Sequence, residues 1–412
     1  MKTYRLAFIL MASYVSLASS VAEQITPAGG APVDSVPPQS FAQVVNQYFS
    51  QWDTNGDGTL TPEKIDAAVA NPNFHDAAAA ALAAIKVVVR GGKYTLPPIS
   101  QAYLVSSPVR EQSTSDEQID LQDNPDQPGK FNHPPAFQLR YLLALRRLHN
   151  VSRDLFPQSL PSLDACHQGP LADCYFVSVV GAMVYRNPSI VKGMFTQNND
   201  GSTTLAFGNG RRVKVAPLTD AEIAISSTAG ANGLWLTVLE NAYGKIRMEA
   251  QNAGQQDKPD TDSIANGGRP GPVINALDGY QAKYFDFVLR GGQRRRPQFA
   301  MIMRQDLSTA LQEYRLIETV TPSNHLPPGI TPSHAYAVLG YNSDTDLLHM
   351  WNPHGNNFTP KGPDGLQYGY TTKAGQFDIP LSDWLKIYKR VTFENQIPVR
   401  HFIFSEELSN AN

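Results

Sequence analysis

The chain has 412 residues and a formal net charge of −3, with 34 Lys and Arg against 37 Asp and Glu. Its length allows two or three folding units, and its basic residues are scattered apart from the run Arg294 to Arg296, which argues against a nucleic-acid partner. Two cysteines are too few for a disulfide-stabilised scaffold in a chain of this length.

Residues 1–22 have the features of a secretory signal peptide. Two basic residues precede an apolar run from Leu6 to about Ala18, and small residues up to Ala22 fit a cleavage site. The run is too short to span a bilayer, and no later stretch of roughly 20 apolar residues follows. We therefore expect a secreted or periplasmic protein with no membrane partner after signal cleavage. Residues 23–40 are rich in Pro, Gly and Ala and are predicted to be a flexible lead-in.

A small helical module is predicted for residues 41–104. Apolar residues recur at helical spacing from Phe41 to Trp52, and Pro62 fits the first turn of a second helix. Residues 74–89 are rich enough in Ala for a third helix.

The loop between the first two predicted helices resembles the calcium-binding loop of an EF-hand. In "DTNGDGTLTPEK", Asp53, Asn55, Asp57 and Thr59 take positions that supply calcium-binding oxygens. Position 12, where a bidentate Glu is expected, is Lys64. Two interpretations follow: a structural or regulatory Ca²⁺ held by these residues, or a solvated acidic turn that caps the next helix. We find no second loop of this kind.

The remainder of the chain forms a larger unit after a linker. Residues 105–134 are polar and rich in Pro, which predicts a linker or an extended strap. Residues 135–412 show helical patterns first and strand patterns later, which predicts an α+β unit with two lobes.

Both cysteines, Cys166 and Cys174, lie in one short segment. Pro170 fits the first position of a predicted helix, so Cys174 is expected near the helix N-terminus, where the partial positive charge favours a thiolate. A buried, structural cysteine is the alternative. Because a disulfide would consume the nucleophile, we predict a free Cys174 in the active protein, with an inhibitory or storage disulfide as the other possibility.

Several segments resemble calpain-type cysteine peptidases, in the order found in that family. "QGPLADCYF" contains Gln168 and Cys174, "SHAYAVLGY" contains His334, and "MWNPHG" contains Asn352. "GLWLTVLENAYGKI", "NGGRPGPVINALDG" and "GQFDIPLSDWLKIY" resemble further segments of the family's core. The resemblance runs from about residue 135 to 404. It implies a papain-like fold, with a helical lobe that carries the Cys and an antiparallel β lobe that carries the His and Asn.

The resemblance also implies catalytic roles for four residues. Cys174 would attack the peptide carbonyl, His334 would act as base and then acid, Asn352 would orient His334, and Gln168 would help to bind the oxyanion. The residues themselves support the His–Asn pair. A hairpin that turns near "NSDTD" would place Asn352 opposite Tyr336, one diagonal step from His334. No cofactor is expected to take part in bond making.

Two residues depart from the family's pattern. Tyr175 stands where calpains have a Trp after the Cys, and His354 stands where they have a Trp beside the Asn-Pro pair. In resting calpains that second Trp blocks the site, so the change bears on the family's calcium switch. His349 and His354 are weaker candidates for the base than His334.

The resemblance implies a secreted calpain-like cysteine endopeptidase that acts on protein or peptide substrates. Calcium modulation would follow if the EF-hand-like loop binds the ion. One alternative is a non-catalytic, calcium-dependent binding scaffold. A second is an acyl transferase that uses the same triad, with an amine in place of water.

Overall fold

The computed structural model describes residues 39–92, 94–108, 135–158, 160–251, 260–265, 267–288 and 298–399. The predicted signal peptide, nearly all of the lead-in, most of the linker and the run Arg294 to Arg296 lie outside these residues. The contacts of the chain from Gln39 onward form one compact unit. Its mixture of helices and strands agrees with the α+β prediction.

The N-terminal part consists of helices joined by short loops. In chain order they are α1 (Phe41–Trp52), α2 (Pro62–Val69), α3 (Asp76–Arg90) and α4 (Gln101–Val105). Ser40 begins α1 with a capping box, and the Thr61 side chain caps α2 directly before Pro62. The three predicted helices are therefore confirmed, whereas α4 was not predicted.

Helix α3 attaches this part to the rest of the chain. Its Ala-rich sequence is buried along most of its length, and small side chains let neighbouring helices approach closely. It shares one hydrophobic cluster with α6 (Phe137–Asn150) and α9 (Asp220–Ile225). The N-terminal helices thus pack directly against the larger unit.

The first half of the larger unit is mainly helical. Its remaining helices are α7 (Cys174–Arg186), α8 (Pro188–Gly193), α10 (Trp235–Gln251), α11 (Asp260–Ile264) and α12 (Pro270–Asp278), with the short 3-10 helices η1 (Leu163–Ala165) and η2 (Gly230–Asn232). A small antiparallel sheet lies beside them, formed by β1 (Phe195–Gln197), β2 (Thr203–Ala206) and β3 (Arg212–Val215).

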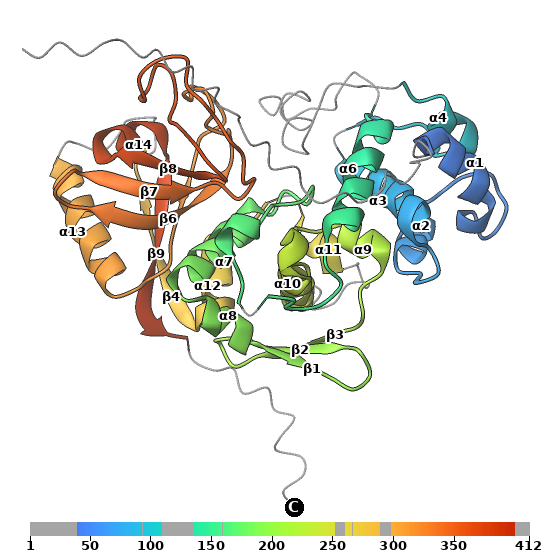
Figure 1. The fold of residues 1–412 in the computed structure, drawn as a ribbon, viewed down its shortest axis with the longest axis horizontal. Helices are drawn as coiled ribbons and strands as arrows, with labels where there is room; N and C mark the ends of the chain where they lie inside the picture. Colours follow the sequence, from blue (N-terminus) through green and yellow to red (C-terminus); the bar gives the residue numbers. More distant parts are fainter. Residues whose placement is uncertain are drawn as a thin grey trace, which may run out of the picture. The chain divides into compact units, whose positions relative to one another are not determined.

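The second half of the described chain is built on a six-stranded sheet with the order β4-β9-β5-β6-β7-β8. The strands are β4 (Tyr280–Asp286), β5 (Ile317–Val320), β6 (Ala335–Asn342), β7 (Leu347–Trp351), β8 (Gln376–Pro380) and β9 (Arg390–Pro398). All neighbouring strands are antiparallel. Helices α13 (Gln298–Gln312) and α14 (Leu381–Ile387) lie on one side of it, and α7 on the other (Figure 1).

Strand β6 is buried on both faces. Tyr336 and Val338 belong to the cluster with α13 and α14, whereas Ala335 and Ala337 belong to the cluster with α7. A Cβ added to Gly181, in the middle of α7, would lie 2.2 Å from the ring of Trp351 in β7. The absence of a side chain at this position therefore allows α7 to lie close against the sheet.

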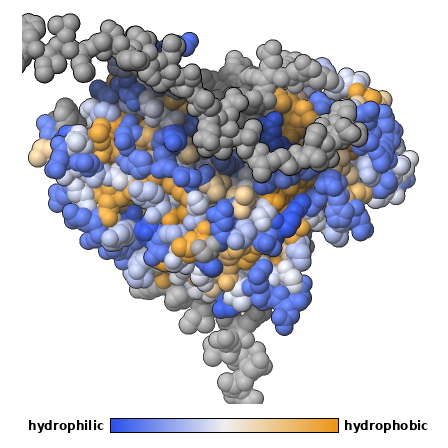
Figure 2. Space-filling view, in the orientation of Figure 1, coloured by the Kyte–Doolittle hydropathy of each residue, from blue (hydrophilic) through white to orange (hydrophobic). Residues whose placement is uncertain are grey.

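The visible face of the molecule has a mixed surface. Figure 2 shows hydrophobic residues in separate patches among hydrophilic ones. Within the described residues, no helix is long and apolar enough to cross a membrane.

Candidate active site

Cys174 is the first residue of α7, so its predicted place near a helix N-terminus is confirmed, but the helix begins four residues after Pro170, the predicted first position. The backbone turns sharply before it, because Ala172 adopts the left-handed conformation with φ 55°. The amide of Phe176 then donates to the carbonyl oxygen of Asp173 over 2.7 Å, which starts the helix. This turn presents a half-buried thiol at the helix N-terminus.

The surroundings of Cys174 oppose its ionisation. Burial raises the pKa of the thiol to about 12, and a hydrogen bond from the backbone N–H of Ala335 offsets this only in part. The carboxyl groups of Asp173 and Glu318 also raise the pKa. The effect predicted for the helix N-terminus is therefore outweighed in this structure, and the thiol needs a base beside it. Ala335 directly follows His334, so the same contact brings α7 to the candidate base.

His334 and Asn352 form a hydrogen-bonded pair, with 2.8 Å between His334 Nε2 and Asn352 Oδ1. Both side chains are buried, with exposed fractions of 4 % and 1 %. An amide oxygen can only accept a hydrogen bond, so Nε2 carries the proton and Nδ1 is the basic atom of the ring. Asn352 is itself held, because its Nδ2 donates to Asn356 Oδ1 over 3.1 Å and its Oδ1 accepts from the backbone N–H of His354 over 3.1 Å.

The predicted hairpin register explains this pairing. Ala337 pairs with Trp351 at the end of β7, and continuing the same register places Tyr336 opposite Asn352. The predicted proximity of His334 and Asn352 is thus confirmed. A β-bulge between Val338 and Gly340 shifts the register by one residue nearer the turn, which the sequence did not indicate.

Gln168 lies against the turn that follows Asn352. Its backbone N–H donates to the carbonyl oxygen of Pro353 over 2.8 Å. The next residue, Gly169, donates to Ser227 Oγ over 3.1 Å, and a Cβ there would lie 2.5 Å from the carbonyl oxygen of Ser226. The side-chain Oε1 of Gln168 is buried and has no hydrogen-bond partner among the described residues. Oε1 therefore keeps the capacity to accept a hydrogen bond from a ligand.

The other two histidines considered from the sequence differ in their surroundings. The ring of His354 stacks on that of His334, with centroids 4.2 Å apart and planes 26° apart. His349 instead contacts Asp378 and Gln376 of β8, at 2.8 Å and 3.1 Å. His354 thus belongs to the surroundings of His334, whereas the side-chain hydrogen bonds of His349 are with strand β8.

Both cysteines are free thiols, as predicted for Cys174. Cys166 is buried, and its Sγ donates a hydrogen bond to the carbonyl oxygen of Ser162 over 3.3 Å. Burial raises the pKa of Cys166, with a smaller contribution from Asp164.

A buried group of ionisable residues lies directly behind Cys174 and was not recognised from the sequence. Asp173 and Glu240 are both fully buried, and Glu240 accepts hydrogen bonds from the backbone N–H of Ser227, with 3.0 Å to each carboxylate oxygen. Burial, followed by the charge of Glu240, raises the pKa of Asp173 well above its ordinary value. Arg90, the last residue of α3, attracts both carboxylates. The N-terminal helices are thereby linked to the residue that precedes the nucleophile.

A cavity of about 1370 Å³ adjoins this region, but none of the four candidate catalytic residues lines it. Its wall contains Gly268 and Arg247. Arg247 hydrogen-bonds Tyr175 Oη, and a Cβ at Gly268 would lie 2.5 Å from the Tyr175 ring. The cavity is therefore separated from Cys174 by the residue that follows it.

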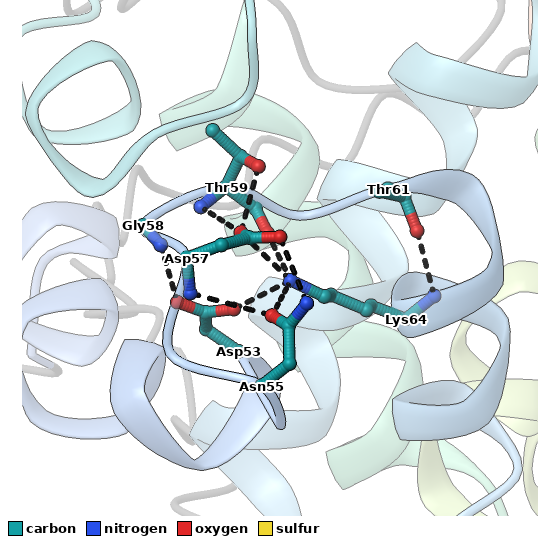
Figure 3. Close-up of polar contacts among 7 residues, drawn as sticks. All are labelled: Asp53, Asn55, Asp57, Gly58, Thr59, Thr61 and Lys64. Carbon is teal, nitrogen blue, oxygen red and sulfur yellow. Dashed lines mark hydrogen bonds and ion pairs between the residues drawn. The ribbon is translucent and has the colours of Figure 1, made fainter.

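The four residues predicted to bind calcium converge on Nζ of Lys64 (Figure 3). Nζ lies 2.6 Å from Asp53 Oδ1 and 2.8 Å from both Asp57 Oδ1 and the carbonyl oxygen of Thr59, and it also contacts Asn55 Oδ1. The hydrogen bonds from Lys64 lower the pKa of both aspartates.

This set of residues does not fit a calcium ion. An ammonium group stands among the oxygens, and a bidentate carboxylate at position 12 is missing. Across the described ranges, no group of three or more His, Cys, Asp or Glu side chains is placed to hold a metal.

The family model for calpain family cysteine proteases matches residues 145–364, which is more than half of the chain. The matched range contains Gln168, Cys174, His334 and Asn352, and it begins after helices α1 to α4. No curated protein matches the chain. The chain belongs to the calpain family of cysteine proteases.

Proposed function

We propose that the chain is a secreted calpain-like cysteine endopeptidase that hydrolyses protein or peptide substrates with Cys174, His334 and Asn352. The observation that carries this proposal is the 2.8 Å contact between His334 and Asn352 beside the hydrogen bond from Ala335 to the Cys174 thiol. Membership of the calpain family supports peptidase activity. The features of residues 1–22 support secretion. We assign the helical half, which carries Cys174, and the sheet half, in which His334 precedes β6 and Asn352 follows β7, to the two lobes of a papain-like core.

In the first step, Nδ1 of His334 removes the proton from Cys174. The sulfur attacks the carbonyl carbon of the substrate, and the imidazolium donates its proton to the leaving amine as the C–N bond breaks. A water molecule then hydrolyses the thioester with His334 as base, which releases the acid and restores the thiol. Asn352 keeps the proton on Nε2 throughout and thereby fixes the useful tautomer.

The negative charge that develops on the carbonyl oxygen needs hydrogen-bond donors. The backbone N–H of Cys174 and the side-chain amide of Gln168 are proposed for this role. The fixed backbone of Gln168, which contacts the turn after Asn352, supports the assignment. Donors that are already in place cost little reorganisation during the reaction.

Product analysis in water enriched in ¹⁸O tests this function. The reduced chain is incubated with an unfolded protein and an added amine, and Cys174→Ser is the matched control. We expect new carboxyl termini that contain ¹⁸O with the wild type and none with the variant. Termini that carry the amine would indicate an acyl transferase. Intact substrate with both proteins would indicate a binding scaffold.

A further inference from the structure

The loop between α1 and α2 holds a cation that belongs to the chain itself. Four oxygens that would face calcium in an EF-hand surround the ammonium of Lys64. The Lys64 side chain is 10 % exposed and that of Asp53 is 5 % exposed, so the ammonium has little contact with water. An ammonium has three N–H donors, and here all its close neighbours are acceptors.

The position of Lys64 in α2 indicates that the loop holds it. It is the third residue of α2, and its backbone N–H donates to the Thr61 cap. A positive charge is unfavourable in the first turn of a helix, because the helix dipole is positive there. Contacts with Asp53 and Asp57 provide the compensating attraction.

The other polar groups of the loop pair with one another. The amide of Gly58 donates to Asp53 Oδ2 over 2.7 Å, and that of Thr59 donates to Asp57 Oδ1 over 2.9 Å. Asn55 Nδ2 donates to Asp57 Oδ2 over 2.9 Å. Each carboxylate therefore has a backbone or side-chain donor in addition to Lys64, and the loop is satisfied without a metal ion.

Calcium would have to displace the ammonium to bind here. The ion takes six to eight oxygen ligands at about 2.3–2.6 Å, and its position-12 carboxylate normally supplies two of them. This loop offers two carboxylates, one amide and one carbonyl around the centre, and its position 12 brings a positive charge instead. The remaining ligands are too few in number and in charge for tight binding.

Helices α3 and α4 form a second helix–loop–helix next to the first. The amide of Leu60 donates to the carbonyl oxygen of Ile99 over 2.9 Å, and Thr59 pairs with Ser100 in an antiparallel bridge. Residues 91–100 between these helices contain no Asp or Glu. The second loop thus lacks the carboxylates that calcium requires, and the first loop lacks the one at position 12.

We propose that the Lys64 ammonium is the resident cation of the loop and makes the paired helix–loop–helix independent of calcium. The N-terminal helices then stay folded and packed on α6 and α9 whether calcium is present or not. Replacing Lys64 with Glu removes the internal cation and restores the position-12 ligand, so this one change should convert the loop into a calcium-dependent one.

Hydrogen exchange of the peptide that covers residues 53–64 tests the proposal, because it reports on this loop and not on the protease core. The full chain with Cys174→Ala, which prevents self-cleavage, is measured in calcium and in chelator. The test variant is Lys64→Glu. The matched control is Lys361→Glu, which makes the same charge change at an exposed position elsewhere.

We expect identical exchange in calcium and chelator for the starting protein and for the control. Lys64→Glu should exchange about tenfold or more faster in chelator and regain protection in calcium. Asp57→Asn provides a second variant in case Lys64→Glu does not fold, and it should exchange faster in both conditions. Protection of the unmodified loop by calcium would overturn the proposal. So would normal exchange of Lys64→Glu in chelator, since the ammonium would then not hold the loop.

Discussion

Removal of the His334 imidazole should make Cys174 nearly inert toward alkylation at neutral pH. Burial raises the pKa of the thiol to about 12, so without a base its thiolate fraction at pH 7 is about 10⁻⁵. An ordinary thiol of pKa about 8.5 has a thiolate fraction of about 3 × 10⁻² at this pH. His334→Ala should therefore react about 10³-fold more slowly than an exposed cysteine. The wild type should react much faster than the variant, because His334 can accept the proton.

Iodoacetamide labelling followed by peptide mass spectrometry measures this effect for each cysteine separately. In His334→Ala the rate at Cys174 should rise about tenfold per pH unit between pH 7 and 10, since a raised pKa leaves the thiol protonated over this range. Buried Cys166 serves as the internal control and should react slowly in both proteins. Equal labelling of Cys174 in the wild type and His334→Ala at pH 7 would refute the reasoning.

Substitutions at four further residues test individual parts of the structure. Gln168→Ala should lower kcat about 10²–10³-fold with little change in KM, because an oxyanion donor acts mainly in the transition state; steady-state kinetics with unchanged kcat would contradict this. His354→Phe should keep the stack on the His334 ring and most of the activity, whereas His354→Ala should lower kcat about tenfold. Equal kcat values for the two variants would show that this ring stack does not contribute to catalysis. Gly181→Ala should destabilise the fold by about 1–3 kcal/mol, because its Cβ meets Trp351, and a melting temperature equal to the wild type would argue against close packing. Burial raises the pKa of Glu318 from 4.5 to about 8, so the folded state holds a proton that the unfolded state has lost at pH values between these two. The free energy of unfolding should therefore fall as pH rises from 4.5 to 8, by up to about 1.4 kcal/mol per pH unit. Glu318→Gln should reduce this slope in thermal unfolding, and an unchanged slope would exclude this group as its source.

Local patterns were sufficient to predict the hairpin and to place Cys174 near the start of α7. Turn residues between two apolar runs located the hairpin, and that register brought Asn352 to His334. The apolar period placed Cys174 near the helix N-terminus, but Pro170, predicted as the first helical residue, lies in the turn before α7. The β-bulge depends on tertiary contacts of the strands and has no signal in the turn sequence.

The joining of the two halves of the site was not predictable from local pattern. Cys174 and His334 are far apart in the chain, and only the family resemblance indicated that they meet. The close contact depends on Gly181 against Trp351, a pair that periodicity does not reveal. Arg90 ends an Ala-rich helix, and from the sequence alone an arginine is expected at the surface. Its position behind Asp173 depends on how α3 packs, which the sequence pattern does not show.

The loop between α1 and α2 shows a different limit of sequence patterns. In the sequence, Lys64 indicates only that the expected calcium ligand at position 12 is missing, because the EF-hand motif specifies which residue type belongs at each position. The structure places its Nζ at the centre of the loop, 2.6 Å from Asp53. A flexible side chain can thus occupy the position of the ion, and a comparison of ligand positions alone does not detect it.

Cleavage of unfolded casein under reducing conditions, by the wild type and by Cys174→Ala, tests the proposed function most directly. We expect the wild type to cleave casein and the variant to leave it intact. In a separate measurement, addition of a chelator should leave the hydrogen exchange of residues 53–64 unchanged. An inert wild type, or equal cleavage by both proteins, would contradict the assignment of Cys174 as the nucleophile of a peptidase.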